Sequence, residues 1–285
     1  MTIVVADITY TEDAEAVVTL VSTDPKSGNV EKLTGVVKVQ IGEQVQEVTV
    51  TDGEGSTVFS GLNAGGKNAI ATFESDGVHD TAVVTTTFNV AKMGTKIVCR
   101  NMTTTAINVT EDGRIGQYFY WNLYDAQGRP LVGKPVSIGF NANVYNRTTD
   151  ENGQARLQIN LQNAGTYTFA ISFLGDENYE GAFEVAKIIV NRQKANLTAS
   201  GATYKASAAT KTLTATYKTK AGKAIVGKTV KFTVNGKTYS AKTDDKGVAK
   251  VNVSLTKAGS YSVEVKATET NTYAEIIKTV TLKLT

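Results

Sequence analysis

The sequence predicts an all-β chain of three β-sandwich domains in tandem, and three observations carry this prediction. One stretch of the chain occurs twice without a gap. Apolar residues alternate with polar ones along short segments, and turn signals separate those segments. No window has a convincing helical period.

The recurring stretch covers residues 133–179, and its first residue, Gly133, recurs as Gly227, which is 227 − 133 = 94 positions later. The residues that recur at this spacing are Gly133, Lys134, Val136, Asn141, Tyr145, Thr149, Asp150, Gly153, Ala155, Leu161, Ala164, Gly165, Tyr167 and Tyr179. A fixed period without insertions indicates one structural unit that has been copied. A chain of 285 residues then divides into domains at residues 1–92, 93–192 and 193–285.

In each copy, apolar and polar residues alternate along short segments, as they do in a β-strand with one buried face. Val230, Phe232 and Val234 are separated by polar residues, so one face of this segment is expected in a core and the other in water. Asn235 and Gly236 follow, a pair typical of a two-residue hairpin because both positions need a positive φ. Short strands spaced in this way favour a sandwich.

The first unit is a diverged copy, in which residues 51–55 and the pair Ala64-Gly65 echo the later turns. Its predicted strands span 2–7, 15–22, 36–41, 44–50, 56–60, 68–74 and 81–90, with a loop at 22–29. Both junctions between units are short and poor in Gly, Ser and Pro, so neighbouring units should be held end to end. The expected shape is a rod on the order of 100 Å long.

The chain lacks the side chains that most catalytic and metal sites need. It has one cysteine, Cys99, and one histidine, His79, which excludes an internal disulfide, zinc sites and Cys/His or Ser/His pairs. It also lacks a P-loop and the common nucleophile motif. We therefore expect that the chain is not an enzyme and needs no cofactor. Cys99 is expected to be a buried small hydrophobic residue, and His79 is expected to lie in a surface turn.

Charge is graded along the chain. Residues 1–92 hold 5 basic and 13 acidic side chains (5 − 13 = −8), residues 93–192 hold 9 of each, and residues 193–285 hold 16 and 5 (16 − 5 = +11). The basic side chains of the last unit are all lysines spread over its length, which fits solvated faces better than nucleic-acid recognition. Opposite charges at the two ends predict weak head-to-tail self-association that salt would screen.

The repeated pattern G-K-x-V, N-G-x-x-Y, T-D-x-x-G-x-A and L-x-x-A-G-x-Y resembles the Ig-like repeats of bacterial and archaeal surface adhesins. It is most similar to the tandem repeats of adhesin-like proteins from methanogenic archaea. The resemblance covers 133–190 and 227–284 well, 93–132 and 193–226 loosely, and 1–92 weakly.

This resemblance implies three tandem immunoglobulin-like β-sandwich domains in an extended rod. It also implies a non-enzymatic adhesin stalk at the cell surface or wall, which mediates or presents attachment to a protein or glycan of another cell. Its motifs are landmarks of the fold and transfer no functional residue. Because the sequence shows no leader and no apolar run of membrane-span length, we expect targeting and anchoring parts elsewhere in a longer chain.

A strip of tyrosines in the middle unit is the candidate binding site. The 94-residue step aligns Phe119, Trp121 and Leu123 with Leu213, Ala215 and Tyr217, which we take as the inward face. The outward residues are then Tyr118, Tyr120 and Tyr124, where the third unit has Thr212, Thr214 and Lys218. Such rings suit sugar or protein ligands. Alternatively, they pack against outer residues of neighbouring strands or against segment 101–116.

A calcium-stiffened structural linker is the alternative function. Asp150, Glu151, Asp176 and Glu177 place carboxylates in turns that we expect at one end of the middle sandwich.

Five N-x-S/T sequons, at Asn101, Asn108, Asn146, Asn196 and Asn252, are glycosylation candidates. An isopeptide bond between Lys96 and Asn191 is a further alternative for the middle unit.

Overall fold

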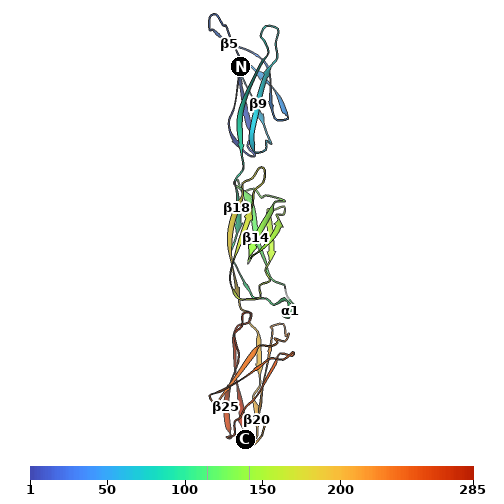
Figure 1. Cartoon of the computed structure of the whole chain (residues 1–285), viewed down its shortest axis with the longest axis vertical. Helices are drawn as coiled ribbons and strands as arrows, with labels where there is room; N and C mark the ends of the chain where they lie inside the picture. Colours follow the sequence, from blue (N-terminus) through green and yellow to red (C-terminus); the bar gives the residue numbers. More distant parts are fainter. Residues whose placement is uncertain (114, 141) are drawn as a thin grey trace.

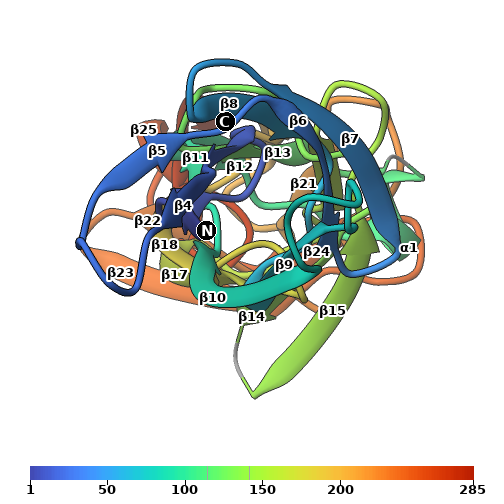
Figure 2. The ribbon, with the colours of Figure 1, turned by 90° about the horizontal axis from the view of Figure 1, so that it is seen from above.

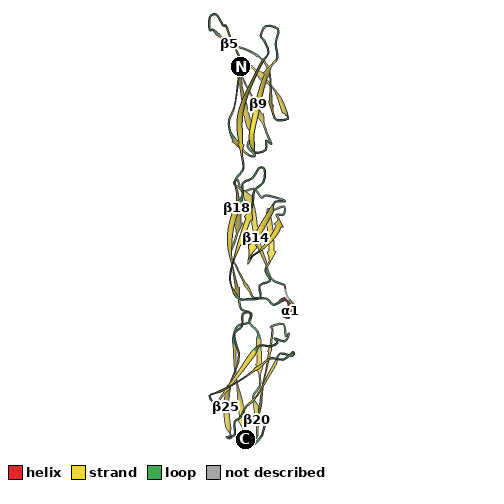
Figure 3. Ribbon diagram, in the orientation of Figure 1, coloured by secondary structure: helices red, strands yellow, loops and turns green. Residues whose placement is uncertain are grey.

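The computed structural model describes residues 1–113, 115–140 and 142–285, and it shows three β-sandwiches stacked end to end in a rod (Figure 1). Asn141, predicted to match Asn235, lies outside these residues. Strands dominate all three sandwiches (Figure 3), so the predicted all-β class and extended shape are confirmed.

Each sandwich packs a three-stranded sheet against a five-stranded one. In the first, the sheets are β1-β3-β8 and β2-β10-β9-β6-β7, in the second β11-β13-β16 and β12-β18-β17-β14-β15, and in the third β19-β21-β24 and β20-β26-β25-β22-β23. The first sandwich is built from β1 (Thr2–Val5), β2 (Ile8–Thr9), β3 (Ala14–Thr19), β6 (Gly35–Ile41), β7 (Gln44–Val50), β8 (Glu54–Phe59), β9 (Gly65–Phe73) and β10 (Ala82–Ala91). The second is built from β11 (Thr95–Cys99), β12 (Met102–Thr105), β13 (Tyr118–Asp125), β14 (Pro135–Phe140), β15 (Asn143–Thr148), β16 (Gln154–Gln158), β17 (Gly165–Phe173) and β18 (Ala182–Asn191). The third is built from β19 (Asn196–Ala199), β20 (Ala202–Tyr204), β21 (Thr212–Lys218), β22 (Thr229–Val234), β23 (Lys237–Lys242), β24 (Val248–Asn252), β25 (Gly259–Ala267) and β26 (Ile276–Leu284).

The chain changes sheet early in every sandwich. After pairing antiparallel in the three-stranded sheet, it crosses over and forms a short strand (β2, β12 or β20) parallel to the last strand of that sandwich. The opening segment of each sandwich is therefore divided into two short strands, one in each sheet, which the crossover joins. The groove described below lies at this crossover in the second sandwich.

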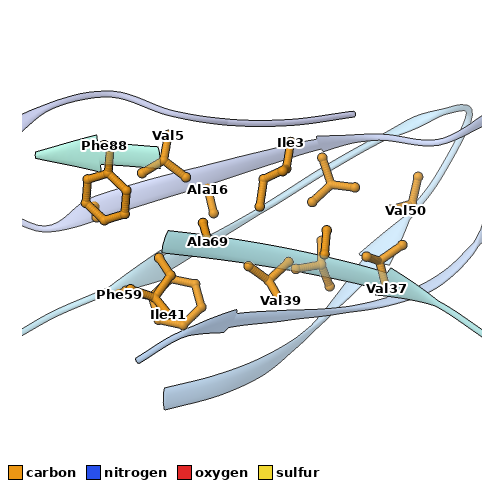
Figure 4. Close-up of a cluster of buried hydrophobic side chains, with 14 of the residues drawn as sticks. Ile3, Val5, Ala16, Val37, Val39, Ile41, Val50, Phe59, Ala69 and Phe88 are labelled. Atoms are coloured by element: carbon orange, nitrogen blue, oxygen red, sulfur yellow. The ribbon is translucent and has the colours of Figure 1, made fainter. Parts of the chain in front are cut away.

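The buried apolar side chains form three separate clusters, one in each sandwich. Figure 4 shows the first, where Val37, Val39 and Ile41 from β6 face Ile3 and other inward residues between the sheets. They alternate with exposed or half-buried residues along β6. The period of two in the sequence is thus the cause of the two-layered core. The exact domain boundaries stay predictions.

The repeat is visible in equivalent hydrogen bonds. The buried Thr149 hydroxyl donates to the Leu131 carbonyl at 2.6 Å, and the Thr243 hydroxyl donates to the Ile225 carbonyl at 2.6 Å. Thr149 and Thr243 are 94 positions apart in the sequence. The gapless period therefore preserves buried polar contacts as well as strands.

The predicted loop at 22–29 holds for residues 24–29, which form the tip of a hairpin. Residues 22 and 23 instead belong to β4 (Val21–Thr23), which pairs with β5 (Val30–Lys32), and Gly28 in the tip adopts a φ of 71° (Figure 1, upper end). A helical turn, α1 (Val109–Asp112), interrupts the long opening segment of the second sandwich. The Asn108 side chain caps α1, and Gly113 ends it with a φ of 63°. Four residues are too few to show a helical period.

The two junctions of the rod are built alike. At the first, the Ala64 amide donates to Asn178 Oδ1 at 2.8 Å, and the rings of Tyr10 and Tyr179 meet edge to face at 5.3 Å. At the second, the Ala164 amide donates to the Asn271 carbonyl at 2.7 Å. These contacts tie the ends of the sandwiches together. Seen along the rod, the sandwiches overlap and β15 projects to one side (Figure 2).

Candidate functional site

The tyrosine strip lies on β13, the central strand of the three-stranded sheet in the second sandwich. Phe119, Trp121 and Leu123 are buried in the core, as the period of two predicts. Tyr118 and Tyr120 point to the other face and are 38% and 44% exposed.

The structure brings Tyr118 and Tyr120 side by side. Their ring centroids lie 6.2 Å apart, and the guanidinium of Arg156 on β16 lies 4.5 Å from the centroid of the Tyr118 ring. Tyr124 lies at the far end of the strand, half-buried and opposite Lys96 in the register. The strip is therefore a pair of adjacent rings with a third further along.

A groove opens beside these rings because β11 ends early. Its pairing with β13 stops where Cys99 faces Trp121, and the chain then crosses to the other sheet, where Met102 pairs with Ile188. The hollow left there has a volume of about 500 Å³, and we call it the tyrosine groove. Its lining residues are Val98, Cys99, Arg100, Asn101, Met102, Tyr118, Phe119, Tyr120, Asn122 and Tyr124. The exposed Arg100 was not among the predicted residues, because only the position of the crossover places it beside the tyrosines.

The third sandwich has a hollow at the same crossover, with different chemistry. It measures about 310 Å³, and the side chains there include Thr198, Tyr204, Thr212, Thr214 and Thr216. The hollow is therefore a property of the fold, whereas the adjacent tyrosines belong to the second sandwich.

The packing alternative holds in part. Arg156, an outer residue of a neighbouring strand, does lie over Tyr118. Of the described residues in segment 101–116, the first two, Asn101 and Met102, line the groove. The helical turn α1 of this segment instead contacts the third sandwich, where the carboxylate of Glu111 accepts a hydrogen bond from the Tyr273 hydroxyl at 2.7 Å.

The acidic turns form contacts of their own. Asp150 Oδ1 accepts from the amides of Asn152 and Gln154, both at 2.9 Å. Asp176 is held by the Lys134 ammonium at 2.6 Å. Partial burial raises the pKa of Asp176. The hydrogen bonds from Lys134 and from two amides together lower the pKa by more than burial raises it, so the net pKa lies below its ordinary value.

Glu151 and Glu177 are exposed. Among the residues outside positions 114 and 141, no three His, Cys, Asp or Glu side chains gather as a metal site. Calcium binding by the predicted carboxylates stays a prediction.

The sequon asparagines differ in their surroundings. Asn101, Asn146, Asn196 and Asn252 are exposed, and Asn108 is half-buried where it caps α1. Asn101 lines the tyrosine groove, and its Oδ1 accepts from the Lys187 amide at 2.8 Å. A glycan on Asn101 would therefore cover the groove.

Four further residues were named from the sequence. Cys99 is half-buried rather than buried, because it lies where the groove begins; burial and the nearby Glu184 raise the pKa of its thiol. Lys96 and Asn191 are both exposed and lie on different sheets, and the isopeptide bond between them stays a prediction. The His79 ring lies 3.0 Å from Asp76 in a surface turn.

Comparison with known proteins found similarity only among solved structures. No protein-family model matches the chain, and no curated protein matches its sequence. A bacterial ice-binding adhesin of 1.5 MDa, studied for host cell surface retention, is 15% identical with a TM-score of 0.34, over 100% of this chain and 99% of that one.

Two other adhesins show a similar level of likeness. The Ca²⁺-stabilised, ice-binding adhesin of an Antarctic bacterium is 15% identical with a TM-score of 0.33, over 99% of this chain and 73% of that one. Invasin, a bacterial integrin-binding protein, is 13% identical with a TM-score of 0.44, over 100% of this chain and 60% of that one. Likeness at this level assigns no function. The resemblance to methanogen repeats stays an expectation.

No helix in the described part of the chain is long and apolar enough to cross a membrane.

Proposed function

We propose that this chain is a non-enzymatic adhesive rod of an extracellular surface protein. In this proposal it attaches to a protein or glycan on another cell through the tyrosine groove, and parts outside this chain anchor it to the membrane or wall. The observation that carries the proposal is the contrast between the two equivalent grooves. Tyr118 and Tyr120 stand where the third sandwich has Thr212 and Thr214, so the fold forms without these rings.

The chemistry of the groove suits attachment. Two adjacent rings on a strand present flat, amphipathic surfaces that lose little conformational entropy when a ligand covers them. The end-to-end contacts between sandwiches would hold this groove at a fixed position along the rod, away from an anchoring surface.

The direct test replaces both tyrosines by the residues of the third sandwich. Fluorescent beads coated with the chain would be incubated with a glycan array and with a panel of microbial and animal cells. We expect Tyr118→Thr with Tyr120→Thr to lower attachment by about tenfold or more, since each lost aromatic contact costs about 1 kcal/mol.

The matched control is Thr212→Ala with Thr214→Ala, which alters the equivalent groove of the third sandwich. It should leave attachment unchanged. The melting temperature of each variant shows whether its sandwich still folds. Unchanged attachment of the tyrosine variant together with a lower melting temperature would show that the rings serve packing alone.

A further inference from the structure

The edge of β13 beside the tyrosine groove is open for pairing. The Ile159 amide donates to the Gln117 carbonyl at 2.8 Å, and the Leu123 amide donates to the Gly153 carbonyl at 2.8 Å. Odd-numbered residues of β13 thus direct their backbone groups to the β16 side. Because successive residues of a strand direct these groups to opposite neighbours, Tyr118 and Tyr120 direct theirs to the β11 side.

In the described part of the chain, no strand lies opposite these residues on that side. The register of β11 ends at Cys99 opposite Trp121, so no residue of β11 lies opposite Tyr118 or Tyr120. The 500 Å³ groove occupies this place. An extended segment lying in it would continue the ladder that β11 leaves at the crossover.

The side chains around the groove define what such a segment carries. Tyr118 and Tyr120 lie on one face of β13, two residues apart, so they would flank alternate side chains of an added strand. Arg100 lines the groove, and the guanidinium of Arg156 on β16, which is not a lining residue, lies over the ring of Tyr118. Carboxylates on the incoming segment would pair with these cations.

We propose that the tyrosine groove binds an extended acidic polypeptide segment, which adds as a strand to the edge of β13 at Tyr118 and Tyr120. This inference rests on the proposed function, and it names the ligand class of the same site. Strand addition gives affinity through the main chain and specificity through the flanking side chains. A glycan could stack on the rings but would offer no alternating amides and carbonyls to the edge.

The test uses the whole chain and a phage-displayed library of random peptides of roughly twelve residues, long enough to span the strand. We expect selection of peptides rich in Asp and Glu that lose about tenfold or more in affinity for the Tyr118→Thr, Tyr120→Thr variant. Amide hydrogen exchange would then be measured by NMR. The bound peptide should slow exchange at Tyr118 and Tyr120 by about tenfold or more, while Thr212 and Thr214 in the equivalent groove stay unchanged.

Two results would overturn strand addition. One is that no peptide depends on the tyrosines, and the other is that bound peptides leave the exchange of Tyr118 and Tyr120 unaltered. A glycan that binds the unaltered chain and not the tyrosine variant, without any peptide ligand, would refute this inference and leave the proposed function standing. If the tyrosine variant binds peptides, glycans and cells as strongly as the unaltered chain, both the inference and the proposed function are refuted.

Discussion

The hydroxyl of Tyr273 donates a hydrogen bond to the carboxylate of Glu111 across the second junction of the rod, with 2.7 Å between the oxygens. Glu111 belongs to the helical turn α1 of the second sandwich, and Tyr273 is fully buried in the third. The ring of Tyr217 meets Tyr273 at 6.0 Å, and burial with the nearby Glu111 charge raises the pKa of Tyr217 to about 12. A single turn of helix thus links two sandwiches.

Replacing Tyr273 by Phe should weaken this junction. A hydrogen bond to a charged group contributes about 1.5–3 kcal/mol, so we expect the free energy of unfolding of the third sandwich to fall by about that amount. Denaturant unfolding followed by circular dichroism measures it, and small-angle X-ray scattering reports bending of the rod. Tyr179→Phe is the matched control, because its ring contact with Tyr10 does not need the hydroxyl. Equal effects of the two variants would show that the bond to Glu111 contributes nothing.

Asp125 should make the second sandwich sensitive to acid. Its carboxylate is buried, which raises its pKa. The guanidinium of Arg129 at 2.6 Å and the amides of Gln127 and Arg129 together lower the pKa by more than burial raises it, so the pKa lies below its ordinary value of 3.8. Since the folded pKa is the lower one, this stabilisation is complete above the unfolded value of about 3.9 and is lost as the pH falls through the folded pKa.

The third sandwich offers the substitution that tests this. Thr219 stands 219 − 125 = 94 positions after Asp125, and its hydroxyl accepts from the Lys223 amide at 3.2 Å. Asp125→Thr should therefore keep the turn and reduce the acid destabilisation of the second sandwich below about pH 4. The fluorescence of Trp121, the single tryptophan, reports on this sandwich. An identical acid profile in the variant would exclude Asp125 as the titrating group.

Much of the fold could be predicted from the sequence because it depends on short-range patterns. The alternation in Val230, Phe232 and Val234 predicts the buried face of β22, and the gapless period transfers it to the second sandwich. The tyrosine strip followed from the same two-residue period. The groove did not, because it depends on β11 ending at Cys99 and on a four-residue crossover strand. Long-range partners such as Glu111 and Tyr273 leave no local signal.

Self-association should depend on salt. The first unit carries a net −8 and the last a net +11, as 5 − 13 and 16 − 5 charged side chains. Attraction between exposed charges is screened beyond about 10 Å at 0.1 M salt. We therefore expect sedimentation velocity to show weak association at low salt that disappears at about 0.5 M salt. Association that persists undiminished at high salt would have another cause.

Calcium should have little effect on stability if the chain is an adhesive rod as proposed. Asp176 is already paired with Lys134, and Asp150 caps its own turn. We expect the melting temperatures in calcium and in chelator to agree within about 2 °C, because binding to the folded state alone would raise the value in calcium. A rise of roughly 5 °C or more in calcium, lost in Asp176→Asn, would favour the calcium-stiffened linker instead.

Attachment through the tyrosine groove is tested most directly by moving the rings from one sandwich to the other. The chain with Tyr118→Thr and Tyr120→Thr would be compared, on the same cells or glycans, with a chain that also carries Thr212→Tyr and Thr214→Tyr. We predict that the first variant attaches about tenfold or more weakly than the unaltered chain and that the second regains attachment through the equivalent groove of the third sandwich. If the first variant attaches as strongly as the unaltered chain while all three proteins remain folded, the rings of Tyr118 and Tyr120 are not the attachment site.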